Sequence, residues 1–219
     1  MRPTIIFTVA IAVFVLLSIA IVYTRLGPPS VQTPSQLGEL PLPTWAMSFG
    51  NPNAPVTVIE LFDLHCPYCA WAQTQLDPLY RKLLERGELR VIYLDFIGHR
   101  EALIAHQYLH CAYRQLGDKT LDLITKAYEA LGCERHPQGI LCSPQGPEKQ
   151  LQLLQQYKCV DAPTVNDFDN AKRAFERYLA QIGVDKWRQG TPTFIIIKNG
   201  TLHVVVGAQV DRVASLISQ

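Results

Sequence analysis

Residues 56–69 read Val-Thr-Val-Ile-Glu-Leu-Phe-Asp-Leu-His-Cys-Pro-Tyr-Cys, and this stretch decides the fold. Its first half, residues 56–62, is apolar and rich in β-branched residues, which predicts a buried strand. The pattern then becomes helical from about Cys66 to Arg86, and a second apolar run at residues 89–96 predicts another strand. A strand, a helix and a strand joined by short connections form a βαβ unit, so we expect the two strands to be parallel.

The C-terminal part of the chain begins with strands and ends with a helix. Residues 194–198 and 202–206 are short apolar runs joined by Asn199-Gly200, a strong signal for a two-residue hairpin. Apolar residues at helical spacing then predict a closing helix. Most of the middle of the chain has helical spacing, but residues 132–147 are rich in Gly and Pro and indicate a loop. The expected fold class is α/β, a thioredoxin-type sheet of βαβ and ββα units with an inserted helical block.

Cys66 and Cys69 lie where the first strand ends and the helix begins, and this position predicts their chemistry. The first thiol faces the free N–H groups and the positive end of the helix dipole, which stabilise a thiolate. We therefore expect Cys66 to be the solvent-accessible nucleophile and Cys69 the shielded thiol that resolves a mixed disulfide. An inert pair or half of a zinc site is the alternative, but the chain has no second C-x-x-C.

The segment from Gly50 to Cys69 resembles the opening of a DsbA-family thiol–disulfide oxidoreductase. Gly-Thr-Pro-Thr-Phe at residues 190–194 is similar to the cis-proline loop of that family. Together the two motifs are more specific than Cys-Pro-Tyr-Cys alone, which glutaredoxins also carry. The resemblance implies one DsbA-like domain over residues 49–219, with a helical insertion at about residues 99–188. It also implies oxidation of protein dithiols, with no cofactor and no metal.

The resemblance assigns roles to residues around the two thiols. Pro192 would be a cis-proline that faces them, and Thr191 would offer backbone groups to a substrate peptide. The alternative is a trans-proline that starts an ordinary strand. Glu60 matches the position of the family's buried acid, which has a raised pKa and can exchange a proton with Cys69. A glutamate at a locally solvated position of the strand is the other reading.

Three histidines have two readings each. If His65 is protonated, it stabilises the Cys66 thiolate, whereas an exposed loop histidine has little effect. His106 and His110 have the i, i+4 spacing of metal ligands, but no flanking acid resembles a metalloprotease helix, so we expect a packed or surface role. The residues between the cysteines, which would tune the redox potential in an unknown direction, are Pro67 and Tyr68.

The other four cysteines are expected to form structural disulfides, because unpaired thiols are a liability outside a reducing cytosol. Cys133 and Cys142 lie in one Gly- and Pro-rich loop that can close on itself. Cys111 falls on an apolar helix face with Ile104, and Cys159 follows a short helix, so these two could meet within the insertion. The favoured pairs are Cys133–Cys142 and Cys111–Cys159. The two crossed pairings, and a free Cys111 in the core, remain open.

The N-terminus predicts a membrane anchor, assigned to residues 1–25. Residues 5–23 are almost entirely apolar, and as a helix they would span about 28 Å, close to the hydrocarbon thickness of a bilayer. A cleaved signal peptide is the alternative, although its apolar region is usually about 7–15 residues long. Arg2 precedes the run, and after Arg25 the next Lys or Arg is Arg81. This asymmetry favours a cytoplasmic N-terminus and an extracytoplasmic catalytic domain.

Residues 26–48 are rich in proline and predict an extended stalk, with an ordered loop wrapped on the domain as the alternative.

The whole chain has 20 Lys+Arg against 19 Asp+Glu, so its charge gives no reason to expect nucleic acid as a partner. Hydrophobic residues make up 48% of the chain and charged residues 18%, which excludes wholesale disorder.

The leading functional hypothesis is an oxidase that introduces disulfides into exported proteins with free thiols and is reoxidised by a membrane redox partner. A disulfide isomerase or reductase of the same family is the first alternative. The isomerase branch adds an N-terminal dimerisation domain, and the sequence before Gly50 offers little room for one. A non-catalytic thioredoxin-like adaptor is the second alternative.

Overall fold

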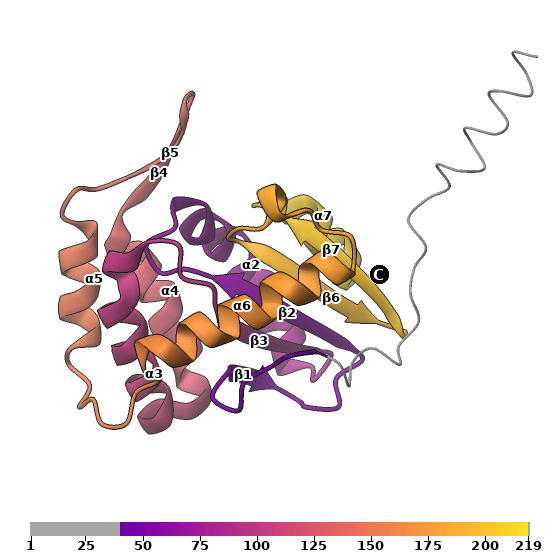
Figure 1. Ribbon diagram of the computed structural model, residues 1–219, viewed down its shortest axis with the longest axis horizontal. Helices are drawn as coiled ribbons and strands as arrows, with labels where there is room; N and C mark the ends of the chain where they lie inside the picture. Colours follow the sequence, from indigo (N-terminus) through magenta and orange to yellow (C-terminus); the bar gives the residue numbers. More distant parts are fainter. Residues whose placement is uncertain (1–39, 219) are drawn as a thin grey trace, which may run out of the picture. The chain divides into compact units, whose positions relative to one another are not determined.

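A five-stranded mixed sheet forms the centre of the computed structural model, which describes residues 40–218 (Figure 1). In sheet order the strands are β1 (Met47–Gly50), β3 (Leu89–Asp95), β2 (Val56–Phe62), β6 (Thr193–Lys198) and β7 (Thr201–Val206). β2 and β3 are parallel, and the other neighbours are antiparallel. Asn199 and Gly200 both have positive φ in the turn between β6 and β7. The predicted βαβ and ββα units are confirmed.

The folded domain begins earlier than the sequence indicates. β1, whose first two residues lie in the segment assigned to the stalk, pairs with β3 and places Met47 opposite Tyr93. Leu40, Leu42 and Ala46 pack against a buried apolar cluster. Residues 40–48 are therefore part of the domain, as in the alternative of an ordered segment wrapped on it. The predicted anchor and the rest of the stalk lie outside the described residues.

Helices cover both faces of the sheet. On one face, α2 (Pro67–Glu85) and α7 (Val210–Ser218) bury side chains such as Tyr80 and Val213 against the side of β2 that carries Val58 and Phe62. On the other face, α6 (Val165–Gln181) packs against the side of β2 that carries Ile59. Since side chains alternate along a strand, Glu60 points to the same side as Val58, towards α2.

α6 was expected inside the insertion, and this assignment is wrong. Phe175 and Leu179 of α6 share one buried cluster with Ile195 of β6 and Leu94 of β3, so α6 is a layer of the sheet core. The inserted part therefore ends before α6, near Thr164.

Within the described residues, no helix is long and apolar enough to cross a membrane.

The inserted part consists of three α-helices and a small hairpin. Its elements are η2 (Arg100–Ala102), α3 (Leu103–Leu116), η3 (Gly117–Lys119), α4 (Thr120–Leu131), β4 (Cys133–His136), β5 (Gly139–Cys142) and α5 (Gly146–Leu154). After α6, a short helix η4 (Lys186–Arg188) leads to β6. In Figure 1 the β4–β5 hairpin projects from the body of the domain. The sequence predicted a loop there, because strands of four residues are too short to establish an alternating pattern.

Two disulfides fix the insertion. Cys133 and Cys142 face each other across the β4–β5 pair and are joined, with their Cα atoms 3.8 Å apart. Cys111 of α3 is joined to Cys159, with a Cα–Cα distance of 4.9 Å. These are the two pairs that the sequence favours. Ile104, placed with Cys111 on the apolar face of α3, is instead 51% exposed. His106 and His110 occupy the buried face in its place.

α4 and α5 approach each other so closely at Gly146 that a side chain there has no space. A Cβ atom at this position would lie 2.1 Å from the carbonyl oxygen of Leu131. We expect Gly146→Ala to lower the free energy of unfolding by about 2 kcal/mol, because the backbone of α4 must shift. Urea denaturation measures this change. Gly190→Ala is the control, since its Cβ would meet no atom within 4 Å. Equal stabilities of the two variants would contradict the proposed close packing.

Candidate active site

Cys66 is the residue that caps the N-terminus of α2, and the cis-proline loop lies against it. The Cys69 N–H donates a hydrogen bond to Cys66 Sγ at 3.4 Å. The Cys66 thiol donates to the carbonyl oxygen of Thr191, also at 3.4 Å, and the Thr191–Pro192 peptide bond is cis. The fold therefore brings together two motifs that are 125 residues apart in the chain.

The two thiols have opposite electrostatic environments. A hydrogen bond from the Cys69 thiol, assisted by the Thr191 side chain and the N–H groups of Cys69 and Tyr68, outweighs desolvation and lowers the pKa of Cys66 to about 6. Burial raises the pKa of Cys69 well above its ordinary value. Cys66 is 4% exposed and Cys69 is fully buried. Cys66 is thus the more accessible thiol, although it is far less exposed than the sequence analysis expected.

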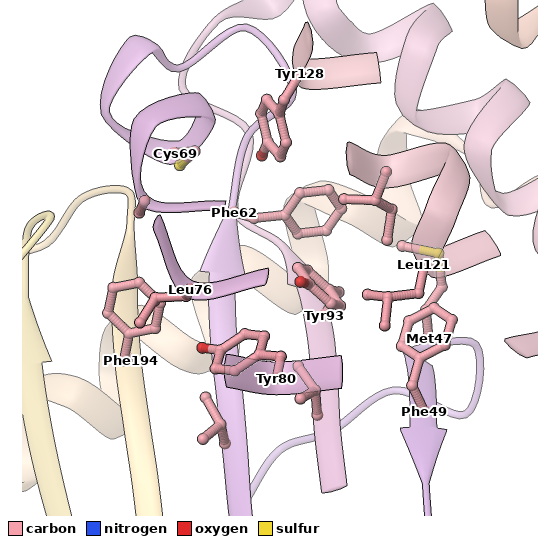
Figure 2. Close-up of a cluster of buried hydrophobic side chains, with 14 of the residues drawn as sticks. Met47, Phe49, Phe62, Cys69, Leu76, Tyr80, Tyr93, Leu121, Tyr128 and Phe194 are labelled. Atoms are coloured by element: carbon pink, nitrogen blue, oxygen red, sulfur yellow. The ribbon is translucent and has the colours of Figure 1, made fainter. Parts of the chain in front are cut away.

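Glu60 is a buried acid beneath the dithiol. Its side chain is 1% exposed, and neither carboxyl oxygen has a hydrogen-bond partner in the part of the chain that the structure describes. Burial, and secondarily the charge on Cys66, raise the pKa of Glu60 to about 8. The alternative of a solvated strand position is therefore wrong. Glu60 also raises the pKa of Cys69, so the two groups interact. Figure 2 shows Cys69 beside the apolar cluster that contains Phe62 and Tyr80.

His65 does not act as the protonated neighbour that one reading of the sequence allowed. The residue is half-buried, and desolvation lowers the pKa of its ring, so it is neutral at neutral pH. Backbone N–H groups and the thiol of Cys69 stabilise the Cys66 thiolate instead. Pro67 is the first residue of α2, and Tyr68 is 49% exposed beside the nucleophile.

Asp63 is a site residue that the sequence analysis missed. Its fully buried carboxylate accepts hydrogen bonds from the N–H groups of His65, Gly98 and His99, and it lies 2.9 Å from His99 Nδ1. Burial raises the pKa of Asp63, but these hydrogen bonds and the nearby His106 lower it by more. Asp63 therefore anchors the loop before Cys66 as a charged group. The partners lie up to 43 residues away, and no local pattern marks them.

The two histidines of α3 lie in the core near this loop. Both contact the buried carboxylate of Asp95 at the end of β3. Of the packed or surface role that the sequence analysis expected, they have the packed one. No group of three or more His, Cys, Asp or Glu side chains among residues 40–218 is placed to hold a metal ion.

A groove of about 370 Å³ lies next to the dithiol. Its walls come from the start of α2, the β4–β5 hairpin and the connection from β7 to α7. The lining residues are Tyr68, Trp71, Arg135, His136, Pro137, Gly139, Ile140, Ala208 and Gln209. The Gly207 N–H donates to the carbonyl oxygen of Pro192 at 2.8 Å, so the wall at Ala208 is attached to the cis-proline loop. The groove thus adjoins residues that neighbour the thiols and the cis-proline loop, although neither cysteine lines it.

The fold and the Cys66–Cys69 dithiol define a thioredoxin-type protein whose two thiols have the arrangement of a redox pair. A family model described as Thioredoxin matches residues 44–204, and the chain therefore belongs to this family. No curated protein matches the sequence.

Several solved structures share the fold. The chain is similar to a periplasmic thioredoxin-like protein from Salmonella enterica serovar Typhimurium, with 20% identity, a TM-score of 0.54, and 83% of this chain and 94% of that chain covered. It is similar to the catalytic domain of Proteus mirabilis ScsC, with 18% identity, a TM-score of 0.53, and coverages of 84% and 93%. It is also similar to the thiol-disulfide exchange protein α-DsbA2 from Wolbachia pipientis, with 18% identity and a TM-score of 0.53. The match covers 84% of this chain and 91% of that chain. At these identities the likeness shows the fold alone.

Glu60 predicts a specific dependence of stability on pH in the reduced protein. Its pKa is raised from about 4.5 to about 8 on folding, so the folded state binds one more proton than the unfolded state between these values. Stability contributed by neutral Glu60 is therefore present below about pH 4.5 and is lost as the pH rises towards about 8. Glu60→Gln should abolish this loss and make the variant more stable than wild type by several kcal/mol at about pH 8, but not at about pH 4.

Urea denaturation of the reduced proteins across this pH range measures the effect. Glu85→Gln, which changes an exposed glutamate of α2, is the matched control and should follow wild type. If Glu60→Gln also followed wild type, Glu60 would have an ordinary pKa and could not hold a proton at neutral pH.

Proposed function

We propose that this protein is a thiol–disulfide oxidoreductase that introduces disulfides into exported proteins. The observation that carries the proposal is the stabilised thiolate of Cys66, whose pKa is lowered to about 6 while the pKa of Cys69 is raised. A stabilised thiolate favours the reduced dithiol, so the corresponding disulfide is a better oxidant.

The exchange proceeds through a mixed disulfide. A substrate thiolate attacks Cys66 Sγ of the Cys66–Cys69 disulfide, the S–S bond breaks, and the Cys69 thiolate leaves. Because the pKa of Cys69 is high, this thiolate needs a proton, and neutral Glu60 is the buried acid that supplies it. A second substrate thiolate then attacks the substrate sulfur and releases Cys66 as a thiolate. The substrate loses two electrons, and the protein gains them.

The surroundings of Cys66 favour a polypeptide substrate. The backbone of Thr191 lies against the nucleophile and offers strand-like pairing to an extended peptide. The groove beside it combines the rings of Tyr68 and Trp71 with the guanidinium of Arg135, which lies 5.2 Å from the Trp71 ring centroid. Such a mixed apolar and polar groove suits side chains that flank a substrate cysteine.

Extracytoplasmic action and a membrane anchor belong to the same proposal. The two structural disulfides support an oxidising compartment, because a reducing cytosol keeps thiols unpaired. Residues 5–23 would anchor the chain with its N-terminus in the cytoplasm, and a membrane redox partner would reoxidise the dithiol. A reporter fused to the C-terminus, active only outside the cytoplasm, tests this topology.

An isomerase or reductase uses the same dithiol, and an adaptor does not use it at all. Cys66→Ser abolishes function in an oxidase and in an isomerase or reductase, and it spares the function of an adaptor. The reduction potential separates an oxidase from a reductase.

We expect the Cys66–Cys69 couple to be more oxidising than thioredoxin, whose potential is about −270 mV. At pH 7, a thiol with a pKa near 6 favours the reduced couple by about 1 kcal/mol, or about 20 mV, relative to one with a pKa near 7. Equilibration of the full chain with glutathione buffers measures the potential. A value at or below that of thioredoxin would exclude the oxidase and favour the reductase.

We expect the groove to favour peptide substrates over small dithiols. Trp71→Ala should lower the ratio of kcat/KM for a dithiol peptide to that for dithiothreitol by about 5- to 10-fold, because it removes the side chain that supports Arg135. Trp187→Ala is the matched control, since this tryptophan is 82% exposed and does not line the groove. An unchanged ratio in Trp71→Ala would show that substrates do not use the groove.

A further inference from the structure

Leu64, two residues before Cys66, is held at both of its backbone polar groups by side chains of the helical insertion. Its N–H donates to Nε2 of His106, on α3, at 3.0 Å. Its carbonyl oxygen accepts from Nε2 of Gln150, on α5, at 3.0 Å. All of these groups are buried. Side chains far away in the sequence therefore replace the backbone pairing that a strand would have given this residue.

The ring of His106 is itself oriented by Asp95. Nδ1 of His106 lies 2.5 Å from one carboxylate oxygen of Asp95, and Nε2 of His110 lies 2.8 Å from the other. The ring is 0% exposed and packs against the rings of Phe62 and Phe168. It therefore has one donor position and one acceptor position, each with a fixed partner.

The Leu64 N–H decides the protonation state of this ring. Burial lowers the pKa of His106, but the carboxylates of Asp63 and Asp95 raise it by more, which favours an imidazolium. However, the Leu64 N–H points at Nε2, and a proton there would set two N–H groups against each other. Asp63 is 3.8 Å from Nε2, beyond hydrogen-bonding distance. The geometry therefore assigns a neutral ring with its proton on Nδ1, directed at Asp95.

We propose that His106 is a positioning residue for the nucleophile: its neutral ring, oriented by Asp95, fixes Leu64 and through it the distance from Cys66 Sγ to the N–H groups of α2. The link from Leu64 to Cys66 is short, because both residues belong to one turn, in which the Cys66 N–H donates to the carbonyl oxygen of Asp63 at 3.0 Å. Sγ and the Cys69 N–H are 3.4 Å apart, so a small displacement of the turn weakens this bond. This deepens the proposed function, on which it rests, by naming what sets the reactivity of its thiolate.

Two substitutions of His106 separate its two contacts. His106→Asn retains a donor near Asp95 but cannot reach Leu64, whereas His106→Gln retains an acceptor where Nε2 stood. We expect the thiolate pKa of Cys66, followed by ultraviolet absorbance of the reduced full chain, to rise by about 0.5–1 unit in His106→Asn. In His106→Gln it should stay within about 0.3 unit of wild type. His110→Asn is the matched control, because His110 shares Asp95 but does not contact Leu64.

Equal pKa shifts in His106→Asn and His110→Asn would overturn the proposal, since the effect would then come from general loosening of the core. If a variant fails to fold, nitrogen chemical shifts of His106 in the wild-type protein decide the matter: a neutral ring protonated on Nδ1 supports the proposal, and an imidazolium overturns it. Both measurements are independent of whether the protein oxidises or reduces its substrates. Failure of the oxidase hypothesis would appear in the reduction potential instead.

Discussion

A negative charge on one buried sulfur atom is the feature around which the domain is organised. Cys66 is only slightly exposed, so donors of the protein must supply most of the stabilisation of its thiolate. The N–H groups at the start of α2 supply part of the stabilisation, and the thiol of Cys69 and the side chain of Thr191 supply more. The parallel pairing of β2 with β3 and the antiparallel pairing of β2 with β6 bring these donors to one end of the sheet.

Three buried carboxyl groups near this end of the sheet differ in pKa because their surroundings differ. Asp63 and Asp95 each have more than one hydrogen-bonding partner, and their pKa values are lowered in spite of burial. Glu60 has no donor within the described part of the chain, and its pKa is raised to about 8. The first two can therefore hold charge and orient the loop before Cys66, whereas the third can hold a proton. This division matches the needs of a site that must be rigid and must also transfer a proton.

The sequence predicted most of the sheet, because β2, β3, β6 and β7 have continuous apolar runs between clear breaks. It also predicted which thiol lies at the helix start. It missed β1, since four residues after a proline-rich stretch give no periodic signal, and it placed α6 in the insertion, since periodicity does not say what an apolar face packs against. Asp63 and the pair of Asp95 with His106 were missed because their roles depend on contacts between distant segments.

The dependence of the dithiol on distant segments has a consequence for the newly made chain. Strand β2 and helix α2 emerge from the ribosome well before α5 and the cis-proline loop, which carry Gln150 and Thr191. Until those later segments have folded back, Cys66 lacks the contacts with Thr191 and a fixed turn before it, and behaves more like an ordinary thiol. Full reactivity is thus acquired last. An unfinished chain therefore carries Cys66 with a smaller fraction of thiolate at neutral pH than the folded domain does.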